Sequence, residues 1–177
     1  MEGTLEDFLS LFRLRQVALK RESIDMRAMV AEVVAAMQKQ YPRASQISVG
    51  PLPRVNGDRG LIRQVWVNLL VYAVKFTGCR DAPKITIEAT PTQLGGRDMI
   101  EFRVADNGVG FDRASAGHLF ELFHRQQSAR EFEGHGVGLA IVHAVVERHG
   151  VQVRADSEPD HDAVFSFSLP AATPTAG

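Results

Sequence analysis

The sequence predicts an α+β fold, namely a two-layer α/β sandwich in which three helices cover one face of a mixed, mostly antiparallel sheet. Apolar residues recur at helical spacing in four segments, and they alternate with polar residues in four others. Helices and strands follow one another in an order that suits a sheet covered by a helical layer. The chain has 177 residues, of which 45% are hydrophobic and 23% charged, so one domain with a sizeable core is expected.

Charge and cysteine content narrow the class of protein. The chain has 20 Lys and Arg against 21 Asp and Glu, a formal net charge of -1, so no basic excess favours a nucleic-acid partner. Its one cysteine, Cys79, excludes an internal disulfide and a zinc site built from cysteines. No apolar stretch reaches about 18 residues and the N-terminus lacks a signal-peptide pattern, which favours a cytoplasmic location.

The N-terminal half predicts three helices and one short strand. The first helix has an apolar face formed by Leu5, Phe8, Leu9 and Phe12. Aspartates are expected to cap the second and third helices, and Thr77-Gly78 ends the third. The predicted elements are a helix at 4–20, a helix from Asp25 to Tyr41, a strand at 47–49 and a helix from Asp58 to about Phe76.

The C-terminal half predicts four strands and one helix. The strands are marked by Ile85, Ile87 and Ala89; by Ile100, Phe102 and Val104; by Val151, Val153 and Ala155; and by Phe165, Phe167 and Leu169. The helix runs from about Gly138 to Arg148. A polar stretch at 107–133 precedes it, and loops of that length in a compact domain are usually functional lids or partly disordered. This stretch is the first indication of a site.

The third predicted helix carries a polar stripe on one face. The stripe consists of Gln64, Asn68, Tyr72 and Lys75. Apolar residues flank it, including Trp66 and Leu69. A solvated helix face is the more common explanation of such a pattern, but a stripe that ends in lysine between heavy apolar residues also suits a half-buried polar ligand.

A glycine-rich turn, Asp106-Asn107-Gly108-Val109-Gly110-Phe111, follows a predicted strand. Two glycines spaced by one residue let the backbone turn sharply or approach a ligand closely. Asp106 is a candidate acceptor for an amino group, and hydrogen bonds to charged groups contribute about 1.5–3 kcal/mol. The alternative is a tight turn in which Asp106 bonds only its own backbone, and the segment alone slightly favours that turn.

A second glycine-rich turn, Gly134-His135-Gly136-Val137-Gly138-Leu139, leads directly into the last predicted helix. Glycines before a helix free backbone N–H groups to hold phosphate oxygens. A dinucleotide-binding fingerprint competes with this interpretation, because Asp156 lies about 20 residues on. That fingerprint fails, because the third glycine stands one position early and the preceding run at 126–133 is polar rather than a strand.

Two other kinds of site are not indicated. The histidines show no paired spacing typical of metal ligands, such as His-Glu-x-x-His, and a serine nucleophile elbow is absent. The six histidines are His118, His124, His135, His143, His149 and His161.

Taken in order, these segments resemble the catalytic and ATP-binding domain of sensor histidine kinases, within the gyrase–MutL–histidine kinase ATPase superfamily. RQVWVNLLVYAVKFT at 63–77 resembles the N box, DNGVG at 106–110 the first glycine box, LFELFHR at 119–125 the F box and GHGVGLAIV at 134–142 the second glycine box. RQVWVNLL and VVERHG are most similar to the phytochrome-like branch. The likeness covers the chain from Ile24 to Pro170, and four boxes in the family's order are a specific signal.

The resemblance implies a nucleotide site and a role for each residue in it. Asp106 would bind the adenine amino group of ATP, and Gly108 and Gly110 would let the purine pack against the strand end. Asn68 and Lys75 would face the phosphates and Mg²⁺, with Asn68 a weak metal ligand, and would act by positioning and charge neutralisation. Residues 112–133 would form a lid. The other ATP-binding residues would be Arg125, Gly134, Gly136, Gly138 and Leu139.

The resemblance also implies partners and divides the chain. Residues 1–22 would be the second helix of a dimerisation hairpin, 23–170 the ATP-binding domain and 171–177 a disordered tail. The first helix would form a homodimer through residues 4–20. The phosphoacceptor histidine would come from a hairpin segment outside this chain, because no histidine precedes His118. A response regulator would then receive the phosphoryl group.

Two departures from the family pattern bear on catalysis. Tyr72 stands where the N box normally has its principal magnesium ligand, an asparagine, and a phenol is a poor ligand for a hard cation. The segment SEPDHDAV at 157–164 lacks the glycines of a third glycine box. The alternative to a kinase is therefore a degenerate module that binds nucleotide or a partner without turnover. A serine kinase of the anti-sigma type shares these boxes, but the helix at 4–20 argues against it.

Overall fold

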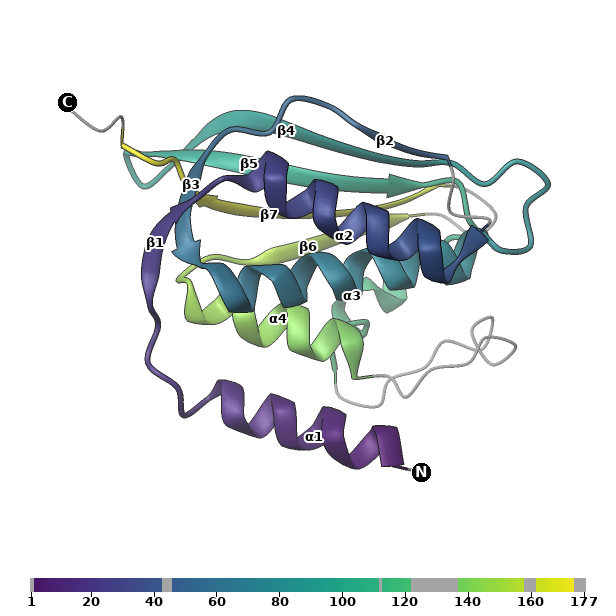
Figure 1. Cartoon of the computed structure of the whole chain (residues 1–177), viewed down its shortest axis with the longest axis horizontal. Helices are drawn as coiled ribbons and strands as arrows, with labels where there is room; N and C mark the ends of the chain where they lie inside the picture. The colour runs from purple at the N-terminus through teal and green to yellow at the C-terminus, as the bar shows by residue number, and fades with distance from the viewer. Residues whose placement is uncertain (1, 43–45, 112, 122–136, 158–161, 174–177) are drawn as a thin grey trace.

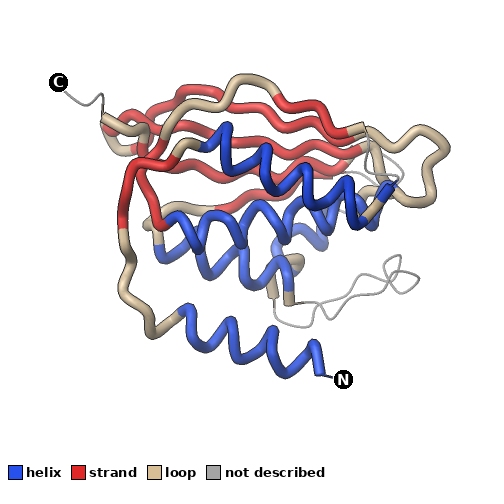
Figure 2. The backbone as a smooth tube through the Cα atoms, viewed as in Figure 1, coloured by secondary structure: helices blue, strands red, loops and turns tan. Residues whose placement is uncertain are grey.

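The computed structural model describes residues 2–42, 46–111, 113–121, 137–157 and 162–173. Within these ranges the helices gather on one side of a five-stranded sheet, and α1 lies beyond α4, farthest from the sheet (Figure 1 and Figure 2). The helices are α1 (Glu2–Leu14), α2 (Met26–Gln40), α3 (Arg59–Thr77), the short 3₁₀ helix η2 (Arg113–His118) and α4 (Gly138–Arg148). The strands are β1 (Arg21–Ile24), β2 (Ile47–Val49), β3 (Val55–Asp58), β4 (Ile85–Leu94), β5 (Arg97–Asp106), β6 (Val153–Ser157) and β7 (Ala163–Pro170).

The main sheet confirms the predicted mixed, mostly antiparallel topology. Its strand order is β2-β4-β5-β7-β6. Only β2 runs parallel to its neighbour, with Ile47 opposite Ile85, and the other three pairs are antiparallel. This order places the end of β5, at Asp106, beside the start of β7 and inside the sheet rather than at its edge.

The predicted helices α2, α3 and α4 are confirmed, and their starts follow local chemistry. The carboxylate of Asp25 accepts a hydrogen bond from the N–H of Ala28 at 3.0 Å, and that of Asp58 accepts one from Leu61 at 3.1 Å. Both are N-caps, which satisfy donors that a helix leaves unpaired. On α3, the fully buried Trp66 packs against the sheet, with its ring edge-on to Phe102 and Phe167.

The first helix is shorter than predicted, and the sequence analysis missed a strand pair. The helix prediction for 4–20 was wrong at its C-terminal end, because α1 ends at Leu14 and the chain then turns. Arg21–Ile24 instead forms β1, which pairs antiparallel with β3 and puts Ile24 opposite Val55. The backbone N–H of Lys20 also donates to the Asp58 carboxylate at 2.9 Å. These non-local hydrogen bonds hold the segment extended, and β1 crosses the predicted domain boundary at residue 22.

The other strands agree with prediction in position and differ in length. β4 and β5 extend into a long hairpin whose turn residues Gly95 and Gly96 have φ of 57° and 75°. The stretch predicted as polar loop contains η2. Ala171 and Ala172, which the sequence analysis placed in the tail, donate backbone hydrogen bonds to Asp98 and Arg54.

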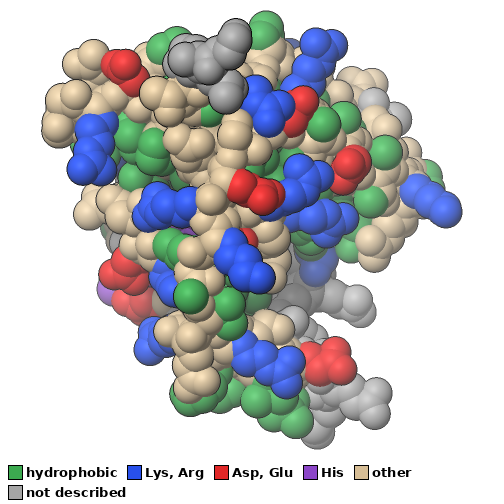
Figure 3. All heavy atoms as spheres, turned by 60° about the vertical axis from the view of Figure 1, so that its left-hand side comes forward, with side chains coloured by type: hydrophobic (Ala, Val, Ile, Leu, Met, Phe, Trp, Pro, Cys, Tyr) green, Lys and Arg blue, Asp and Glu red, His purple; other side chains and the backbone are tan. Residues whose placement is uncertain are grey.

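α1 exposes four large apolar side chains on one face. Leu5, Phe8, Leu9 and Phe12 are between 41% and 63% exposed. Figure 3 shows hydrophobic side chains at the lower end of the molecule, where α1 lies, and Lys and Arg side chains spread over the face above it. Among the helices that the structure describes, none is long and apolar enough to cross a membrane.

Candidate functional site

Three segments that are distant in sequence meet along α3. At the C-terminal end of α3, the turn after β5 is joined to the helix by a hydrogen bond from the N–H of Val109 to the carbonyl of Phe76, at 3.2 Å. Two turns earlier, Asn68 faces the start of α4. A Cβ atom placed on Gly138 would lie 3.0 Å from the Oδ1 atom of Asn68. The structure therefore brings together the two predicted site residues Asn68 and Gly138, and places Asp106 at the other end of the same helix.

Asp106 is buried, with 2% of its surface exposed. Its Oδ1 atom accepts a hydrogen bond from the N–H of Gly108 at 2.9 Å. Its Oδ2 atom is buried and has no hydrogen-bond partner in the described part of the chain. Burial raises the pKa of this carboxyl to about 7, against the lowering effect of the Gly108 hydrogen bond and with a smaller raising effect from Asp162. A buried acceptor without a partner is unusual enough to indicate a missing donor.

Glycine is needed at positions 108 and 110 of the first glycine-rich turn for two different structural reasons. A Cβ atom on Gly108 would lie 2.5 Å from the carbonyl oxygen of Phe76, so a side chain there is excluded by the α3 backbone. Gly110 has φ of 66°, a conformation that favours glycine. Close approach of the turn to α3 therefore explains Gly108 without a ligand, and leaves its predicted contact with a purine as a proposal.

Two side chains whose roles the sequence analysis missed hold this turn in place through hydrogen bonds to the backbone. Asn107 accepts a hydrogen bond from the N–H of Lys84 at 2.7 Å and donates to the carbonyl of Ala82 at 2.9 Å. Arg80 donates to the carbonyls of Asn107 and Gly108, both at 2.9 Å. The presence of Asn107 in a turn could have indicated its role, whereas no sequence pattern pointed to Arg80.

The polar stripe on α3 is half-buried rather than fully solvated along most of its length. Asn68, Tyr72 and Lys75 are all of intermediate exposure, and only Gln64 is exposed. The Asn68 side chain donates to the backbone carbonyl of Gln64 at 2.8 Å, so its amide nitrogen is engaged within the helix. Its Oδ1 atom, near Gly138, is left as the acceptor at that end of the stripe.

Tyr72 belongs to an aromatic cluster against the sheet. Its ring stacks on Phe76 with a centroid separation of 4.2 Å and meets Phe165 edge-on at 5.2 Å. Phe111 and Phe120 pack around the same Phe165. Burial, and secondly the charge of Asp106, hold the pKa of the Tyr72 hydroxyl well above its ordinary value. Its hydroxyl is therefore a neutral donor at physiological pH.

The remaining predicted site residues divide into two groups. Leu139 is buried, at 9% exposure, and belongs to the hydrophobic core. Arg125, Gly134 and Gly136 lie outside the described residues, as does most of the predicted lid. The backbone geometry of the second glycine-rich turn thus stays a prediction up to Val137.

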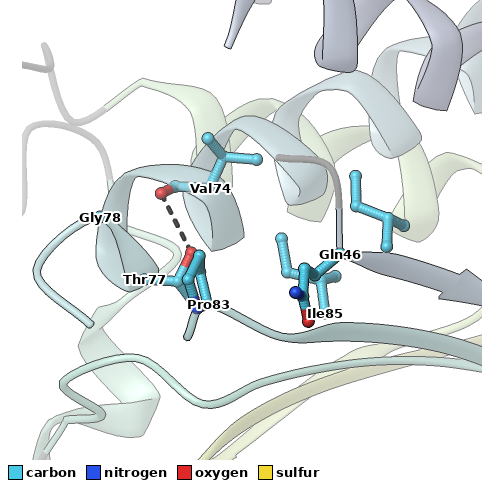
Figure 4. A pocket seen from close by; sticks show the side chains of 7 residues that line it. Gln46, Val74, Thr77, Gly78, Pro83 and Ile85 are labelled. Atoms are coloured by element: carbon cyan, nitrogen blue, oxygen red, sulfur yellow. Dashed lines mark hydrogen bonds between the residues drawn. The ribbon is translucent and has the colours of Figure 1, made fainter. Parts of the chain in front are cut away.

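A small pocket lies between the end of α3 and the starts of β2 and β4. Its lining includes Val74, Thr77, Pro83 and Ile85, and it has room for about one water molecule (Figure 4). Thr77 donates to the carbonyl of Val74 at 3.1 Å within α3. The pocket is too small for a nucleotide base.

Metal ligands are sparse in the described residues. No group of three or more His, Cys, Asp or Glu side chains is placed to hold a metal ion among them. The buried His149 is occupied by two contacts, from the N–H of Asp58 and with the carbonyl of Val145. The free Oδ2 atom of Asp106 can accept a hydrogen bond from an amino group.

Comparison with known sequences gives one family. Residues 57–173 match the family "Histidine kinase-, DNA gyrase B-, and HSP90-like ATPase". The phytochrome-like protein Cph1 of Synechocystis is 29% identical over 96% of this chain, and the methanogenesis regulatory histidine kinase FilI of Methanothrix harundinacea is 33% identical over 96%. The chain spans 22% and 19% of the length of these two relatives.

Solved structures of histidine kinases share the fold. Full-length ShkA, determined in complex with AMPPNP, is similar over 98% of this chain and 36% of its own, with a TM-score of 0.78 and 28% identity. The mycobacterial sensor histidine kinase MprB is similar over 86% of this chain and all of its own, with a TM-score of 0.73 and 24% identity. The latter likeness concerns the fold alone.

Proposed function

Because this chain belongs to the histidine kinase-, DNA gyrase B- and HSP90-like ATPase family, we propose that it is the ATP-binding catalytic domain of a two-component sensor histidine kinase. It would transfer the γ-phosphoryl group of ATP to a histidine outside this chain. In that step the bond from the γ-phosphorus to the β–γ bridging oxygen breaks, a bond to the histidine nitrogen forms, and ADP leaves.

The observation that carries this proposal is the free oxygen of Asp106. Its Oδ2 atom is buried and unpaired while Oδ1 holds the turn. The exocyclic amino group of adenine is a donor of the required kind, whereas guanine presents a carbonyl oxygen at the same place. A buried carboxylate facing that carbonyl would leave two acceptors opposed, so the site should prefer ATP to GTP.

The phosphates would lie toward the other end of α3. Asn68 and the start of α4 meet there, and a helix N-terminus favours anions through its free N–H groups and dipole. Lys75 would contribute a cation on the same helix face. Leu139, Arg125, Gly134 and Gly136 keep their predicted ATP-binding roles as part of this proposal. For Mg²⁺ carried by the phosphates, the Oδ1 atom of Asn68 would be a weak protein ligand, and ATP binding would not depend on it.

The partners follow from α1 and from the reaction. The exposed apolar face of α1 suits the second helix of a dimerisation hairpin, so we assign it a homodimer interface. The phosphoacceptor histidine would belong to that hairpin, in the same or another chain, and a response regulator would take the phosphoryl group in a phosphorelay. Because the reaction consumes ATP, the proposal includes a cytoplasmic location for the domain.

A second candidate function rests on the packing of Tyr72. Its ring lies in an aromatic cluster with Phe76 and Phe165 and supplies no metal ligand on the polar stripe. A module that binds nucleotide without turnover would tolerate this arrangement.

Titration of the chain with ATP and GTP tests the shared part of both candidates. We expect ATP to bind at least about tenfold more tightly than GTP, because one hydrogen bond to a charged group separates them. Equal affinity for both nucleotides, or binding of neither, would contradict the base-binding role of Asp106. Transfer of the γ-phosphoryl group of labelled ATP to a separately supplied phosphoacceptor hairpin then separates the kinase from the module without turnover, because this chain lacks the acceptor histidine.

A further inference from the structure

We propose that this site binds adenine nucleotides without help from a divalent cation, and that the Tyr72 hydroxyl donates a hydrogen bond to the sugar–phosphate part of the ligand. The inference rests on the proposed nucleotide site and deepens it. It concerns how the ligand is held between the base end and the phosphate end of α3.

Tyr72 stands midway between the two ends of the site. The turn that contains Asp106 contacts α3 at Phe76, and the start of α4 faces Asn68. Phe76 and Asn68 are each four positions from Tyr72 along α3, and four residues span about 6 Å of a helix axis. A ligand with its base at Asp106 and its phosphates at the start of α4 therefore passes this side chain.

The Tyr72 ring is fixed by its neighbours. It stacks on Phe76 at 4.2 Å with an angle of 19° between planes, and Phe165 meets it edge-on. Because aromatic pairs of this geometry are favourable beyond their buried area, the ring should keep its position when a ligand binds. Tyr72 is of intermediate exposure, so part of its side chain is open to a ligand.

The same hydroxyl is unsuited to bind a cation. Burial and the Asp106 charge keep it protonated, and Mg²⁺ prefers carboxylate, carbonyl and water oxygens in near-octahedral geometry. A neutral O–H group is instead a good donor to a phosphate oxygen. The side chain therefore favours direct contact with the ligand over contact through a metal.

Few other groups in the described residues could anchor a metal at this place. The buried Asp106 carboxylate is engaged with Gly108 and lies at the base end. Asn68 offers one amide oxygen, since its nitrogen donates to Gln64. No cluster of three acidic, histidine or cysteine side chains occurs in the described segments. One protein oxygen would hold Mg²⁺ weakly.

Calorimetric titration of the full chain tests this proposal with ATP and with adenosine, each in excess Mg²⁺ and in excess EDTA. We expect the ATP affinity to differ by less than about threefold between the two conditions. Tyr72→Phe keeps the ring and should lower the metal-free ATP affinity roughly tenfold or more, as expected for loss of a hydrogen bond to a charged group. It should leave adenosine affinity within about twofold if the contact is to phosphate.

The other tyrosine of the chain, Tyr41, provides the matched control, because Tyr41→Phe should change neither affinity. A tenfold loss of ATP affinity on removal of Mg²⁺ from the unmodified chain would overturn the proposal and leave the nucleotide site intact. Unchanged metal-free ATP affinity in Tyr72→Phe would overturn the role of the hydroxyl. Failure of ATP to bind in either condition would instead overturn the proposed function itself.

Discussion

The Nε2 atom of His149 accepts a hydrogen bond from the backbone N–H of Asp58 at 3.0 Å, which joins the C-terminal end of α4 to the N-cap of α3. Because a backbone N–H can only donate, Nε2 is unprotonated. The Nδ1 atom, 2.7 Å from the carbonyl of Val145, therefore carries the proton and donates. His149 is 4% exposed, and the contact places a neutral imidazole between two helices that frame the site.

Acid should destabilise the fold through His149. Burial lowers the pKa of this imidazole below its ordinary value of about 6.5, so the native state binds fewer protons than the unfolded chain. Its contribution to stability is complete above about pH 6.5 and is lost as pH falls through the lower, folded-state pKa. His149→Phe should lower the free energy of unfolding by about 1–3 kcal/mol at pH 8, because the N–H of Asp58 loses its acceptor.

Urea unfolding of both proteins across a pH series measures this effect. The difference in unfolding free energy between them should shrink as the solution becomes acidic. The exposed His118 is the control, because His118→Phe leaves the contact between His149 and Asp58 in place and should not reproduce the loss of stability at pH 8. A constant difference from neutral to acidic pH would show that His149 does not titrate as described.

Asp106→Asn should abolish the preference for ATP over GTP. The amide keeps an oxygen that can accept from Gly108, but it presents an NH₂ group where the free Oδ2 atom now lies. That donor would oppose the amino group of adenine, so the ATP affinity should fall at least about tenfold. Competition between the two nucleotides for a fluorescent analogue gives the ratio directly. A preserved preference for ATP would remove Asp106 from the base site.

Adenosine affinity should rise with pH through neutrality. The pKa of Asp106 is raised to about 7, and the ionised carboxyl is the stronger acceptor, so binding below this pH requires loss of a proton. Adenosine itself carries no group that titrates between about pH 5 and 9, unlike the terminal phosphate of ATP. Affinity should therefore increase up to about pH 7 and level off above it. A flat profile for the unmodified chain would contradict an ionised acceptor.

Gly108→Ala should destabilise the turn that follows β5. The added Cβ would lie 2.5 Å from the backbone carbonyl of Phe76, so the turn or the end of α3 must move, at a cost of roughly 2–4 kcal/mol. Thermal unfolding measures the loss. Gly60→Ala offers a control of opposite sign, because a Cβ atom there would lie 3.6 Å from the Asp58 carboxylate, an ordinary contact, and alanine favours the helix. Equal stability of both variants would refute the close approach.

Self-association through α1 should be sensitive to charge on its apolar face. Phe8 and Phe12 are 42% and 57% exposed, so the double change Phe8→Glu and Phe12→Glu should leave the unfolding temperature of the domain nearly unchanged while preventing dimers. Sedimentation at several concentrations distinguishes the states. A monomeric unmodified chain at the highest concentration would show that residues 4–20 do not form the interface by themselves.

The sequence predicted the elements whose stability is encoded locally. α2 and α3 were located from their aspartate caps and apolar periodicity, and both caps are present. The pair β1–β3 was missed because each strand has four residues and little alternation, and they become strands only by pairing across more than 30 positions. The end of α1 was misplaced for the same reason, since β1 and the Lys20–Asp58 contact, not helix propensity, fix residues 20–24.

The site was predicted in part because its motifs follow local rules. The two interpretations of Asp106, a tight turn and an acceptor for an amino group, concern different atoms, since Oδ1 closes the turn and Oδ2 stays free. Packing of Tyr72 into the aromatic cluster could not be predicted, because it depends on Phe165, which is 93 positions away and reaches α3 only in the folded sheet. The same holds for Arg80 on the turn.

The hydrogen bonds of Arg80 and Asn107 to the backbone fix the turn at 106–110 before any ligand arrives. A base that binds there does not have to order the loop that receives it, so little conformational entropy is lost at that end of the site. Association should then be limited by encounter rather than by a rearrangement of this turn. The turn would hold the adenine base in a fixed position, and the sugar and phosphates would be oriented relative to it.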